Sequence, residues 1–364
     1  MRLAILGTRG VPARYGGFET FAEELGARLA ADGHQVTVYG RSQFVPSGCR
    51  AHRGMSVVRL PAPRSKYLET VAHTLFSALH AAPRHWDVVY VCNLANVPAV
   101  LLLRALGKRL VLNVDGLEWQ RAKWGPIGRA YYRMCAFVAA HAPIELVTDA
   151  RVIQSYYAAA HNRATHYFPY GTDLQPVADD GTLAALGLEA RGYILYVSRL
   201  EPENNAHVVL DAYRAVRSDL PMAIVGDAPY AGSYIDGLRR AARLDPRVML
   251  LGARYGRAYH VLRSHAAVYV QATEVGGTHP ALVEAMGFGN AIVANDVPEH
   301  HEVLGDAGLY YRRAAELTGA LQRLLDDPEL TDELRSRAAV RARAHYDWDH
   351  VAEAYATWLM ELAG

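Results

Sequence analysis

The fold is most clearly indicated by residues Gln271 to Asp296, which read QATEVGGTHPALVEAMGFGNAIVAND. This stretch leaves an apolar, β-branched segment, passes a glycine pair and enters a helix that Pro280 can open, since proline at the first helical position loses no hydrogen bond. Thr278 or His279 can cap this helix. A second strand-like segment follows at 291–294. The order strand, loop, helix, strand is the repeating unit of a parallel α/β sheet.

The helix that begins beside Gly276 and Gly277 offers a place for an anion. Its first N–H groups and the positive end of its dipole suit a phosphate, and glycines without a Cβ let the backbone approach the ligand closely. Glu284, four residues after Pro280 on the same helix face, could reach a sugar hydroxyl beside the phosphate. An ordinary turn with a solvated glutamate is the alternative, and these residues alone favour neither.

The same stretch resembles the signature of the retaining, nucleotide-sugar-dependent glycosyltransferases of family 4, which have the GT-B fold. In that family two glutamates flank a glycine-containing loop, and the second holds the ribose of the donor. Glu284, followed by Ala-Met-Gly-Phe-Gly, matches the second glutamate. Glu274 is the candidate for the first, two residues farther from Glu284 than in the family. The VGGTHP wording at 275–280 is similar to a branch described as rhamnosyltransferase-like.

Length and composition predict a two-domain protein that stays in a reducing compartment. The 364 residues are 51% apolar, which provides a core for about two domains. The three cysteines, Cys49, Cys92 and Cys135, have no metal-like spacing, so a cytoplasmic chain is the simplest interpretation. No apolar run approaches the roughly 20 residues of a membrane span. Because Met1 and Arg2 lead directly into a strand-like segment, no signal peptide is expected.

The net charge of +1 conceals an uneven distribution. Residues 1–175 hold 20 Lys+Arg and 11 Asp+Glu, whereas the remainder holds 18 and 26. A basic half favours an anionic partner, such as a membrane surface or a lipid-phosphate acceptor, and we expect no nucleic acid. Since only three of the 38 basic residues are lysines, ordinary surface variation in an arginine-rich proteome is the alternative.

The rest of the chain repeats the alternation of strand and helix. Strands are predicted at 3–6, 36–39, 57–58, 88–91, 110–113 and 145–148, and again at 193–197, 222–225, 248–251, 268–270 and 291–294. Helices are expected at about 18–31, after Asp149 as a cap, and at 347–362. A polar, turn-rich stretch at 172–190 separates the two series.

The fold class is therefore α/β, with two Rossmann-like parallel-sheet domains. The resemblance implies a GT-B arrangement in which both domains face across a cleft. Residues 1–171 then form an acceptor-binding domain, and 172–345 form the domain that binds the nucleotide-sugar donor. The helix in 346–364 is expected to return and pack on the first domain.

Two glycine clusters follow the opening strand, Gly7 to Gly10 and Tyr15 to Glu19. Neither has the G-x-G-x-x-G spacing of a dinucleotide site, which disfavours hydride transfer. Gly16, Gly17 and Glu19 match the Gly-Gly-x-Glu element of family 4. The resemblance implies that N–H groups near Gly16 approach the donor diphosphate or the acceptor, and a tight turn is the alternative.

The segment NVDGLEWQRAKW, residues 113–124, is unusually rich in charged and aromatic side chains for a plain connection. Aromatic faces stack on sugars, while carboxylates and arginines bind hydroxyls or phosphates. Asp115 stands where family 4 commonly has a histidine that contacts the transferred sugar. We predict that sugar or acceptor binding involves Asp115, Glu118, Trp119, Arg121 and Lys123. A solvated, Trp-packed loop is the alternative.

In the second half, Arg199 matches a family arginine that neutralises the diphosphate leaving group. The family lysine five residues later is Asn204 here, so one cation is missing. Arg9 or Arg14 could compensate. The segment from Ile224 to Tyr230 resembles the Gly-Asp turn near the nucleotide.

Two further motifs are expected to be structural rather than chemical. Asp347-Trp-Asp349 imitates a metal-binding D-x-D but precedes the last helix, where a capping aspartate is expected. Glu299-His-His-Glu302 lacks zinc-site spacing and is expected on the surface of a short helix. Neither motif thus argues against what the resemblance to family 4 implies, which is no metal, no cofactor and a nucleotide sugar as substrate.

The resemblance to family 4 implies a glycosyltransferase that moves a sugar from a nucleoside-diphosphate donor to a hydroxyl of a glycan, glycolipid or metabolite. It also implies retention and no metal, and the donor could be dTDP-rhamnose or a UDP- or GDP-hexose. Arg199, Glu274 and Asp115 are the catalytic candidates; Arg199 with 276–278 would stabilise the leaving group, and His279 would meet the sugar or its phosphates. The expected location is the cytoplasm, with peripheral binding to the inner face of the membrane as an alternative. A non-catalytic nucleotide-sugar sensor is the alternative, and a GT-B epimerase a weaker one.

Overall fold

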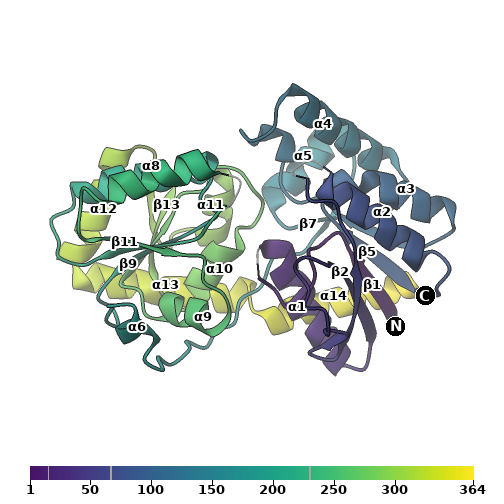
Figure 1. The fold of residues 1–364 in the computed structure, drawn as a ribbon, viewed down its shortest axis with the longest axis horizontal. Coiled ribbons are helices and arrows are strands. Elements are labelled where there is room, and N and C mark those ends of the chain that lie inside the picture. The colour runs from purple at the N-terminus through teal and green to yellow at the C-terminus, as the bar shows by residue number, and fades with distance from the viewer. Residues whose placement is uncertain (15, 66–67, 229–230) are drawn as a thin grey trace. The chain divides into compact units, whose positions relative to one another are not determined.

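The computed structural model describes residues 1–14, 16–65, 68–228 and 231–364. The chain forms two compact units. Unit 1 comprises Met1–Tyr170 and Trp348–Gly364, and unit 2 comprises Gly171–Asp347 (Figure 1). Among the described residues, no helix is long and apolar enough to cross a membrane.

Unit 1 is built on an eight-stranded sheet with the order β3-β4-β2-β1-β5-β6-β7-β8. All neighbouring strands are parallel except β3 and β4, which are antiparallel. The strands are β1 (Arg2–Leu6), β2 (Gln35–Arg41), β3 (Ala51–His52), β4 (Met55–Leu60), β5 (Val88–Cys92), β6 (Leu110–Asn113), β7 (Glu145–Thr148) and β8 (His166–Tyr167).

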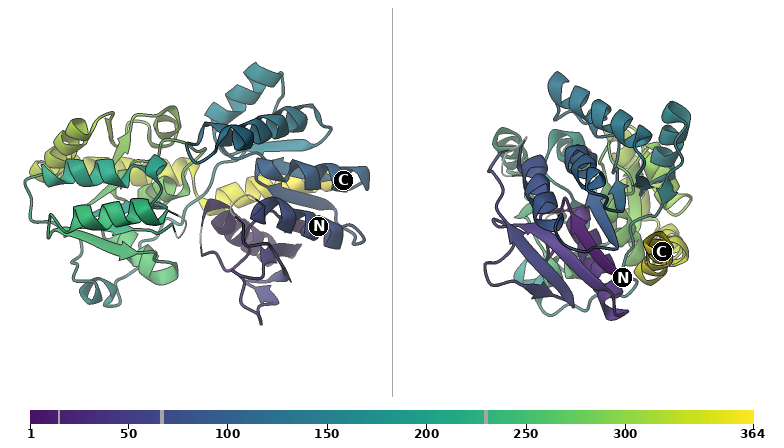
Figure 2. Two further views of the ribbon diagram at one scale, coloured as in Figure 1. Left: turned by 45° about the horizontal axis from the view of Figure 1, so that its top comes forward. Right: turned by 90° about the vertical axis from the view of Figure 1, so that its right-hand side faces the viewer.

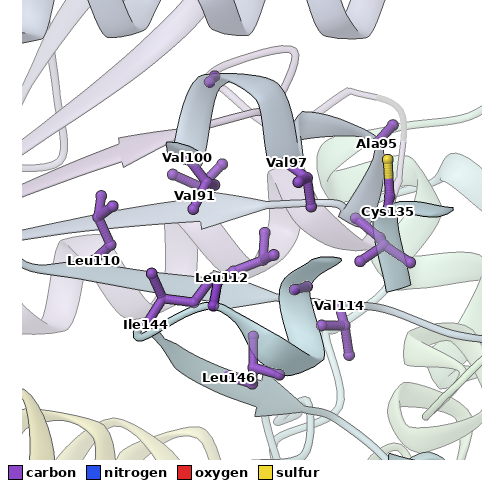
Figure 3. Packing of buried hydrophobic residues seen from close by; sticks show 14 of the residues in the cluster. Val91, Ala95, Val97, Val100, Leu110, Leu112, Val114, Cys135, Ile144 and Leu146 are labelled. Atoms are coloured by element: carbon purple, nitrogen blue, oxygen red, sulfur yellow. The ribbon is translucent and has the colours of Figure 1, made fainter. Parts of the chain in front are cut away.

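Helices cover both faces of this sheet, because successive buried residues of each strand point to opposite sides. In β1, Ala4 and Leu6 face one core and Leu3 and Ile5 face the other. The first core lies under α2 (Glu69–Ala81), α3 (Val97–Ala105), α4 (Pro126–His141) and α5 (Arg151–His161). Figure 3 shows part of this packing, where Val91 of β5 lies beside Val100 of α3 and Leu112 of β6 lies beside Ile144.

The second core of unit 1 lies under α1 (Gly17–Ala31) and the C-terminal helix α14 (Trp348–Ala363). Phe168 stacks on Tyr355 of α14 with 4.1 Å between ring centroids, and the Tyr355 hydroxyl lies 3.1 Å from that of Tyr90. The Arg28 Nε of α1 donates to Asp349 at 2.7 Å. Both chain termini therefore belong to this unit, as the N and C marks in Figure 2 show.

Unit 2 has a six-stranded, fully parallel sheet with the order β11-β10-β9-β12-β13-β14. The strands are β9 (Ile194–Val197), β10 (Met222–Val225), β11 (Val248–Gly252), β12 (Val268–Gln271), β13 (Ala291–Asn295) and β14 (Leu309–Tyr311). One face packs on α7 (Ala206–Arg214), α8 (Gly232–Ala242) and α12 (Ala314–Asp326). The other packs on α6 (Thr182–Ala185), α9 (Gly256–Ser264), α10 (Pro280–Gly287), α11 (Pro298–Leu304) and α13 (Pro328–His345).

Each sheet contains a point where the order of strands reverses, between β1 and β5 in unit 1 and between β9 and β12 in unit 2. Loops that leave two such strands diverge to opposite faces, so the carboxyl ends of these strands border a crevice where ligands of doubly wound sheets bind. The strand order thus assigns a candidate binding edge to each unit.

The predicted fold class, two Rossmann-like parallel sheets, is confirmed. The predicted cap by Asp149 is wrong, because Ala150 occupies the N-cap of α5 and no side chain caps that helix. The prediction for Glu299 to Glu302 needs a correction too. The segment does form a helix, α11, but His300 is fully buried in it.

Candidate functional site

Unit 2 brings the two predicted donor-binding loops together at its switch point. The loop after β9 carries Arg199, and the loop after β12 carries Glu274 to His279. Asn205, in the left-handed conformation at φ +61°, connects them. Its amide nitrogen donates to the carbonyl of Ala272 at 3.0 Å and to the Glu274 carboxylate at 2.8 Å. The two loops therefore form one hydrogen-bonded surface at the carboxyl edge of the sheet.

The glycine loop leads into α10 as the sequence predicts, with Pro280 as its first residue and His279 at the N-cap. The His279 side chain makes no capping hydrogen bond and folds back over the loop instead. A Cβ on Gly276 would lie 2.5 Å from its Cε1 atom, closer than real contacts allow. Gly276 is thus required for the imidazole to lie against the backbone. Gly277 and Thr278 are buried behind it.

Glu284 lies one turn into α10 and is held by two residues of α9. The buried Arg263 guanidinium donates to Glu284 Oε2, and the Tyr259 hydroxyl donates to the same oxygen at 3.1 Å. The Arg263 side chain is 0% exposed and lies 4.5 Å from the Tyr259 ring centroid and 5.2 Å from that of Phe288. No hydrogen bond to Glu284 Oε1 occurs among the described residues. One oxygen thus positions the carboxylate and the other can accept from a ligand.

Arg199 remains about one third exposed at the end of β9, with Nη1 3.6 Å from the buried carboxylate of Glu201. Asn204, at the position of the family lysine, is buried and serves the backbone: its amide donates to the carbonyl of Arg199 at 2.6 Å. Where family 4 has a cationic lysine, this chain therefore has a neutral asparagine whose side chain holds the loop that carries Arg199.

A buried histidine stands behind the glycine loop. The His300 ring centroid lies 4.8 Å from that of His279, and its Nδ1 lies 2.9 Å from the carbonyl oxygen of Asn295. Burial lowers the pKa of His300 to about 4, although the hydrogen bond to Asn295 opposes this shift. A neutral ring therefore supports His279 at neutral pH.

The Gly-Asp turn after β10 also reaches the switch point. Gly226 has φ +147°, and a Cβ there would lie 1.7 Å from the carbonyl oxygen of Ser198, so only glycine fits. Pro229 and Tyr230, the last two residues of the predicted turn segment, lie outside the described residues.

In unit 1, the predicted Gly-Gly-x-Glu element begins α1, with Gly16 at the N-cap and Gly17 as the first helical residue. The Glu19 carboxylate is buried and accepts the backbone N–H of Arg9 at 2.7 Å. Glu19 thus ties the first glycine cluster to α1 rather than pointing to solvent. Tyr15, which precedes Gly16, lies outside the described residues.

The two arginines expected to compensate for the missing lysine are both in unit 1. Arg9 lies 3.7 Å from Glu69 and 4.5 Å from the Phe44 ring centroid, while Arg14 is exposed.

Asp115 follows β6 in the left-handed conformation, with φ +59°. Its backbone N–H donates to the buried Asn113 side chain at 2.9 Å. Asn93, which follows β5, has φ +74°. Left-handed backbone in non-glycine residues is costly and concentrates at functional sites. Two such residues after neighbouring strands mark this edge of unit 1 as its candidate ligand edge.

Glu118, Arg121 and Lys123 form a network of their own. Arg121 donates to Glu118 Oε1 at 2.8 Å, Trp124 Nε1 donates to Oε2 at 3.0 Å, and the Lys123 ammonium lies 3.9 Å from Oε2. Burial would raise the pKa of Glu118, but the charges of Arg121 and Lys123 outweigh it and lower the pKa. Trp119 belongs to the core, where its ring lies 5.4 Å from that of Tyr156. In this arrangement these side chains shape the loop around Asp115.

Within the described residues, no group of histidine, cysteine, aspartate and glutamate side chains could hold a metal ion. A cavity of about 460 Å³ lies at the opposite, amino edge of the unit 1 sheet, and its lining includes His34 and Trp86. None of the predicted site residues lines it.

Sequence patterns missed the two residues that organise the unit 2 site. Arg263 stands in the last turn of α9, and nothing in its neighbourhood distinguishes it from a surface arginine of an amphipathic helix. Asn205 had a weak signal, since asparagine directly before a helix is a common residue for a left-handed turn.

Two family models match the chain, one in each unit. Residues 16–171 match the model described as "Glycosyl transferase 4-like domain". Residues 191–327 match the model described as "Glycosyl transferases group 1". The second match contains the whole switch-point site, from Arg199 to Glu284.

Solved structures share the fold over the full length. A sucrose-phosphate synthase from Thermosynechococcus elongatus superposes with a TM-score of 0.85 at 20% identity, covering 99% of this chain and 98% of that one. Anabaena HepE, in complex with UDP-glucose, gives a TM-score of 0.81 at 18% identity, covering 99% and 100%. At these identities the likeness shows the fold alone.

A curated relative is the alpha-D-kanosaminyltransferase of Streptomyces kanamyceticus, 28% identical over 167 residues. The alignment covers 44% of this chain and 43% of that enzyme, so less than half of the relative is matched. Unit 1 therefore matches a glycosyl transferase 4-like domain and unit 2 a domain of the group 1 glycosyl transferases, and the chain has the GT-B fold over its full length.

Proposed function

We propose that this protein transfers a sugar from a nucleoside-diphosphate donor, bound by unit 2, to a hydroxyl group of a carbohydrate or lipid-linked acceptor. The observation that carries the proposal is the convergence at one switch point of Arg199, the glycine loop at the start of α10, and Glu284. A diphosphate needs cationic and N–H donors, and a ribose needs a positioned carboxylate. The complex of Anabaena HepE with UDP-glucose supports the donor class.

Each group has a distinct task in the proposed reaction. Arg199 and the N–H groups at the start of α10 stabilise the charge that develops on the departing diphosphate. Glu284, held through Oε2 by Arg263 and Tyr259, accepts ribose hydroxyls at Oε1. Glu274 and His279 contact the transferred sugar or its phosphates.

The finer assignments rest on the resemblance to family 4 and are part of the proposal. They are retention at the anomeric carbon, metal independence, a donor such as dTDP-rhamnose or a UDP- or GDP-hexose, and an acceptor held near Asp115, Glu118 and Gly16 in unit 1. In a retaining front-face reaction the leaving phosphate takes the acceptor proton, so a separate protein base is not needed.

A donor screen tests the proposal. The purified chain is incubated with UDP-, GDP-, dTDP- and ADP-sugars, with and without EDTA, and both thermal stabilisation and release of free nucleoside diphosphate are measured. We expect one nucleotide class to raise the melting temperature and to be hydrolysed slowly in the presence of EDTA.

Matched variants connect the result to the site. Arg199→Gln should reduce release of nucleoside diphosphate more than donor binding, because it acts on the charge of the transition state. Arg217→Gln, a change at an arginine outside the site, serves as the control. Binding without release in the presence of candidate acceptors would instead identify a nucleotide-sugar sensor, and no binding by any donor would refute the proposal.

A further inference from the structure

Exposed apolar side chains concentrate on one group of helices in unit 1. Of the 13 large apolar side chains exposed in the described part of the chain, eight lie on α2, α3 and α4 or at their ends. Unit 2 has three, Leu244, Tyr255 and Val340, on separate elements. Scattered apolar residues are normal on a protein surface, whereas a cluster indicates an interaction site.

The helix α4 has apolar side chains on both its inner and its outer side. Tyr132, Cys135 and Ala139 are buried against the core. Ile127, Met134 and Phe137 follow one another at helical spacing on the opposite side, and all are more than half exposed, Ile127 by 88%. The inner side of α4 thus packs on the core of unit 1, while its outer side can contact an apolar surface outside the protein.

The neighbouring helices continue the same surface. On α2, Phe76 and Leu79 are exposed three residues apart, and on α3 and its end Leu101 and Leu106 are exposed. The helix α3 packs against both α2 and α4, and all three cover the same core of the sheet, as Figures 1 and 2 show. We call the exposed apolar side chains of α2, α3 and α4 the apolar ridge.

The charges around the apolar ridge are positive. Neither α3 nor α4 contains an acidic residue. Arg129 and Arg133 are exposed along α4 beside Met134, and neither forms an ion pair within the described residues. Unit 1 as a whole holds 20 Lys+Arg and 13 Asp+Glu, whereas unit 2 holds 18 and 24. The part of the apolar ridge on α3 and α4 therefore lies where acidic residues are absent, and Glu69 of α2 is paired with Arg41 at 3.2 Å.

We propose that the apolar ridge, with Arg129 and Arg133, docks on the surface of an anionic lipid bilayer. Helices that lie in a membrane interface combine apolar side chains, which enter the acyl boundary, with arginines, which reach the headgroup phosphates. An anionic surface also attracts the positive charge. A second copy of the chain fits less well, because a symmetric contact would place Arg129 and Arg133 against each other.

Co-sedimentation of the full-length protein with vesicles tests the proposal. It needs no nucleotide sugar, so its result is independent of the proposed transfer reaction. We expect binding to phosphatidylcholine vesicles that contain phosphatidylglycerol and little binding to phosphatidylcholine alone. Raising the salt from about 0.1 M to about 1 M, where the Debye length falls from about 10 Å to about 3 Å, should weaken it.

Two double variants separate the charged from the apolar contribution. Arg129→Glu with Arg133→Glu should lower the partition coefficient by at least about ten-fold, since each basic residue near an anionic surface contributes roughly five-fold. Ile127→Ser with Phe137→Ser should lower it by a similar factor without abolishing the salt dependence. All four side chains are exposed, so circular dichroism and the melting temperature should remain unchanged.

Matched controls lie in unit 2. Arg323→Glu with Arg343→Glu makes the same change of charge at exposed positions, and Leu244→Ser with Val340→Ser removes exposed apolar side chains. Both control proteins should bind like the unsubstituted chain. Equal losses in the controls, or binding that depends on neither anionic lipid nor the ridge, would overturn the proposal. A dimer that dissociates in the ridge variants, with no vesicle binding, would assign the face to a second copy.

Discussion

Glu284 and Arg263 form the residue pair on which the proposed ribose contact depends. Glu284 is recognisable in the sequence, but the position of its carboxylate is fixed by the guanidinium of Arg263. The Arg263 side chain is 0% exposed and forms its ion pair with Glu284. Removing one partner of a buried pair leaves the other charge uncompensated, which costs more than the pair contributes. Substitution of either residue is therefore expected to lower the free energy of unfolding as well as the affinity for the donor.

We expect Glu284→Ala to weaken donor binding by about 1–3 kcal/mol, the cost of a lost charge-assisted hydrogen bond, measured by calorimetry. It should also lower the free energy of unfolding by about 3 kcal/mol, because the buried Arg263 then lacks its anion. Arg263→Met should both weaken donor binding and lower the free energy of unfolding by about 3 kcal/mol, because Glu284 then remains buried without its cation. Arg263→Lys should recover part of the donor binding. Glu316→Ala, which breaks an exposed pair with Arg313, is the control and should change neither quantity. Unchanged donor binding in Glu284→Ala would remove that residue from the site.

His300 predicts a pH dependence of stability. Its pKa is lowered to about 4 by burial, against about 6.5 in an unfolded chain. Between these values the unfolded state binds a proton that the folded state does not, so stability rises with pH over this window and is lost as the pH falls from about 6.5 to about 4. The expected loss is on the order of 3 kcal/mol.

Denaturant unfolding of the unsubstituted protein and of His300→Gln, followed at several pH values, measures this effect. The difference in unfolding free energy between the two proteins should change in that window and be constant above about pH 7.5. His73, whose pKa burial also lowers to about 4, titrates in both proteins and cancels in the difference. A pH-independent difference would show that His300 is not kept neutral.

At the scale of elements, the glycine loop and the start of α10 act together through Gly276 and His279. A methyl group on Gly276 would occupy the position of the His279 imidazole, 2.5 Å away. The side chain of a histidine can move aside, so the cost in stability is small while the ring leaves its place against the loop.

A double-mutant cycle tests this coupling. We expect Gly276→Ala to change donor affinity when His279 is present and to have no further effect in a His279→Ala background. Additive effects of the two substitutions on donor affinity would mean that the ring and the glycine act independently. Gly237→Ala on α8, where an added Cβ meets only a side-chain atom at 3.9 Å, is the matched glycine control.

At the scale of the whole molecule, each unit has its own sheet and its own two cores, so each is expected to unfold as its own cooperative block. The sequence provides a reporter, because all five tryptophans, at 86, 119, 124, 348 and 358, belong to unit 1. Tryptophan fluorescence therefore follows unit 1, whereas far-ultraviolet circular dichroism follows both units.

We predict that Tyr355→Ala, which removes a buried ring of α14, lowers the stability seen by fluorescence by about 3–5 kcal/mol. Leu321→Ala, in the core of unit 2, should shift the unfolding transition of unit 2, which circular dichroism detects and tryptophan fluorescence does not. A bound nucleotide sugar should raise that second transition by mass action, because the proposed donor site is in unit 2. A single transition that moves equally in both variants would show that the units do not unfold separately.

Most of the fold could be predicted because its signals are local. Buried parallel strands are continuous apolar runs, such as Val88 to Val91, and helices begin at proline or end at glycine. The strands that escaped, β3, β8 and β14, have two or three residues and no such run. The predicted cap at Asp149 was wrong for a different reason, because the helix begins one residue later than expected and Ala150 stands at its N-cap.

The sequence by itself determined the α/β class, the two series of strands, the helix opened by Pro280, and the candidates Arg199, Glu274 and Glu284, since each depends on residues close together in the chain. Only the tertiary structure decided which residues meet at the switch point of each sheet. It paired Arg263 with Glu284, turned Asn204 toward the backbone and buried Trp119. The reason is that strand order and burial depend on contacts between distant segments, where a buried charge must find a partner that local spacing does not reveal.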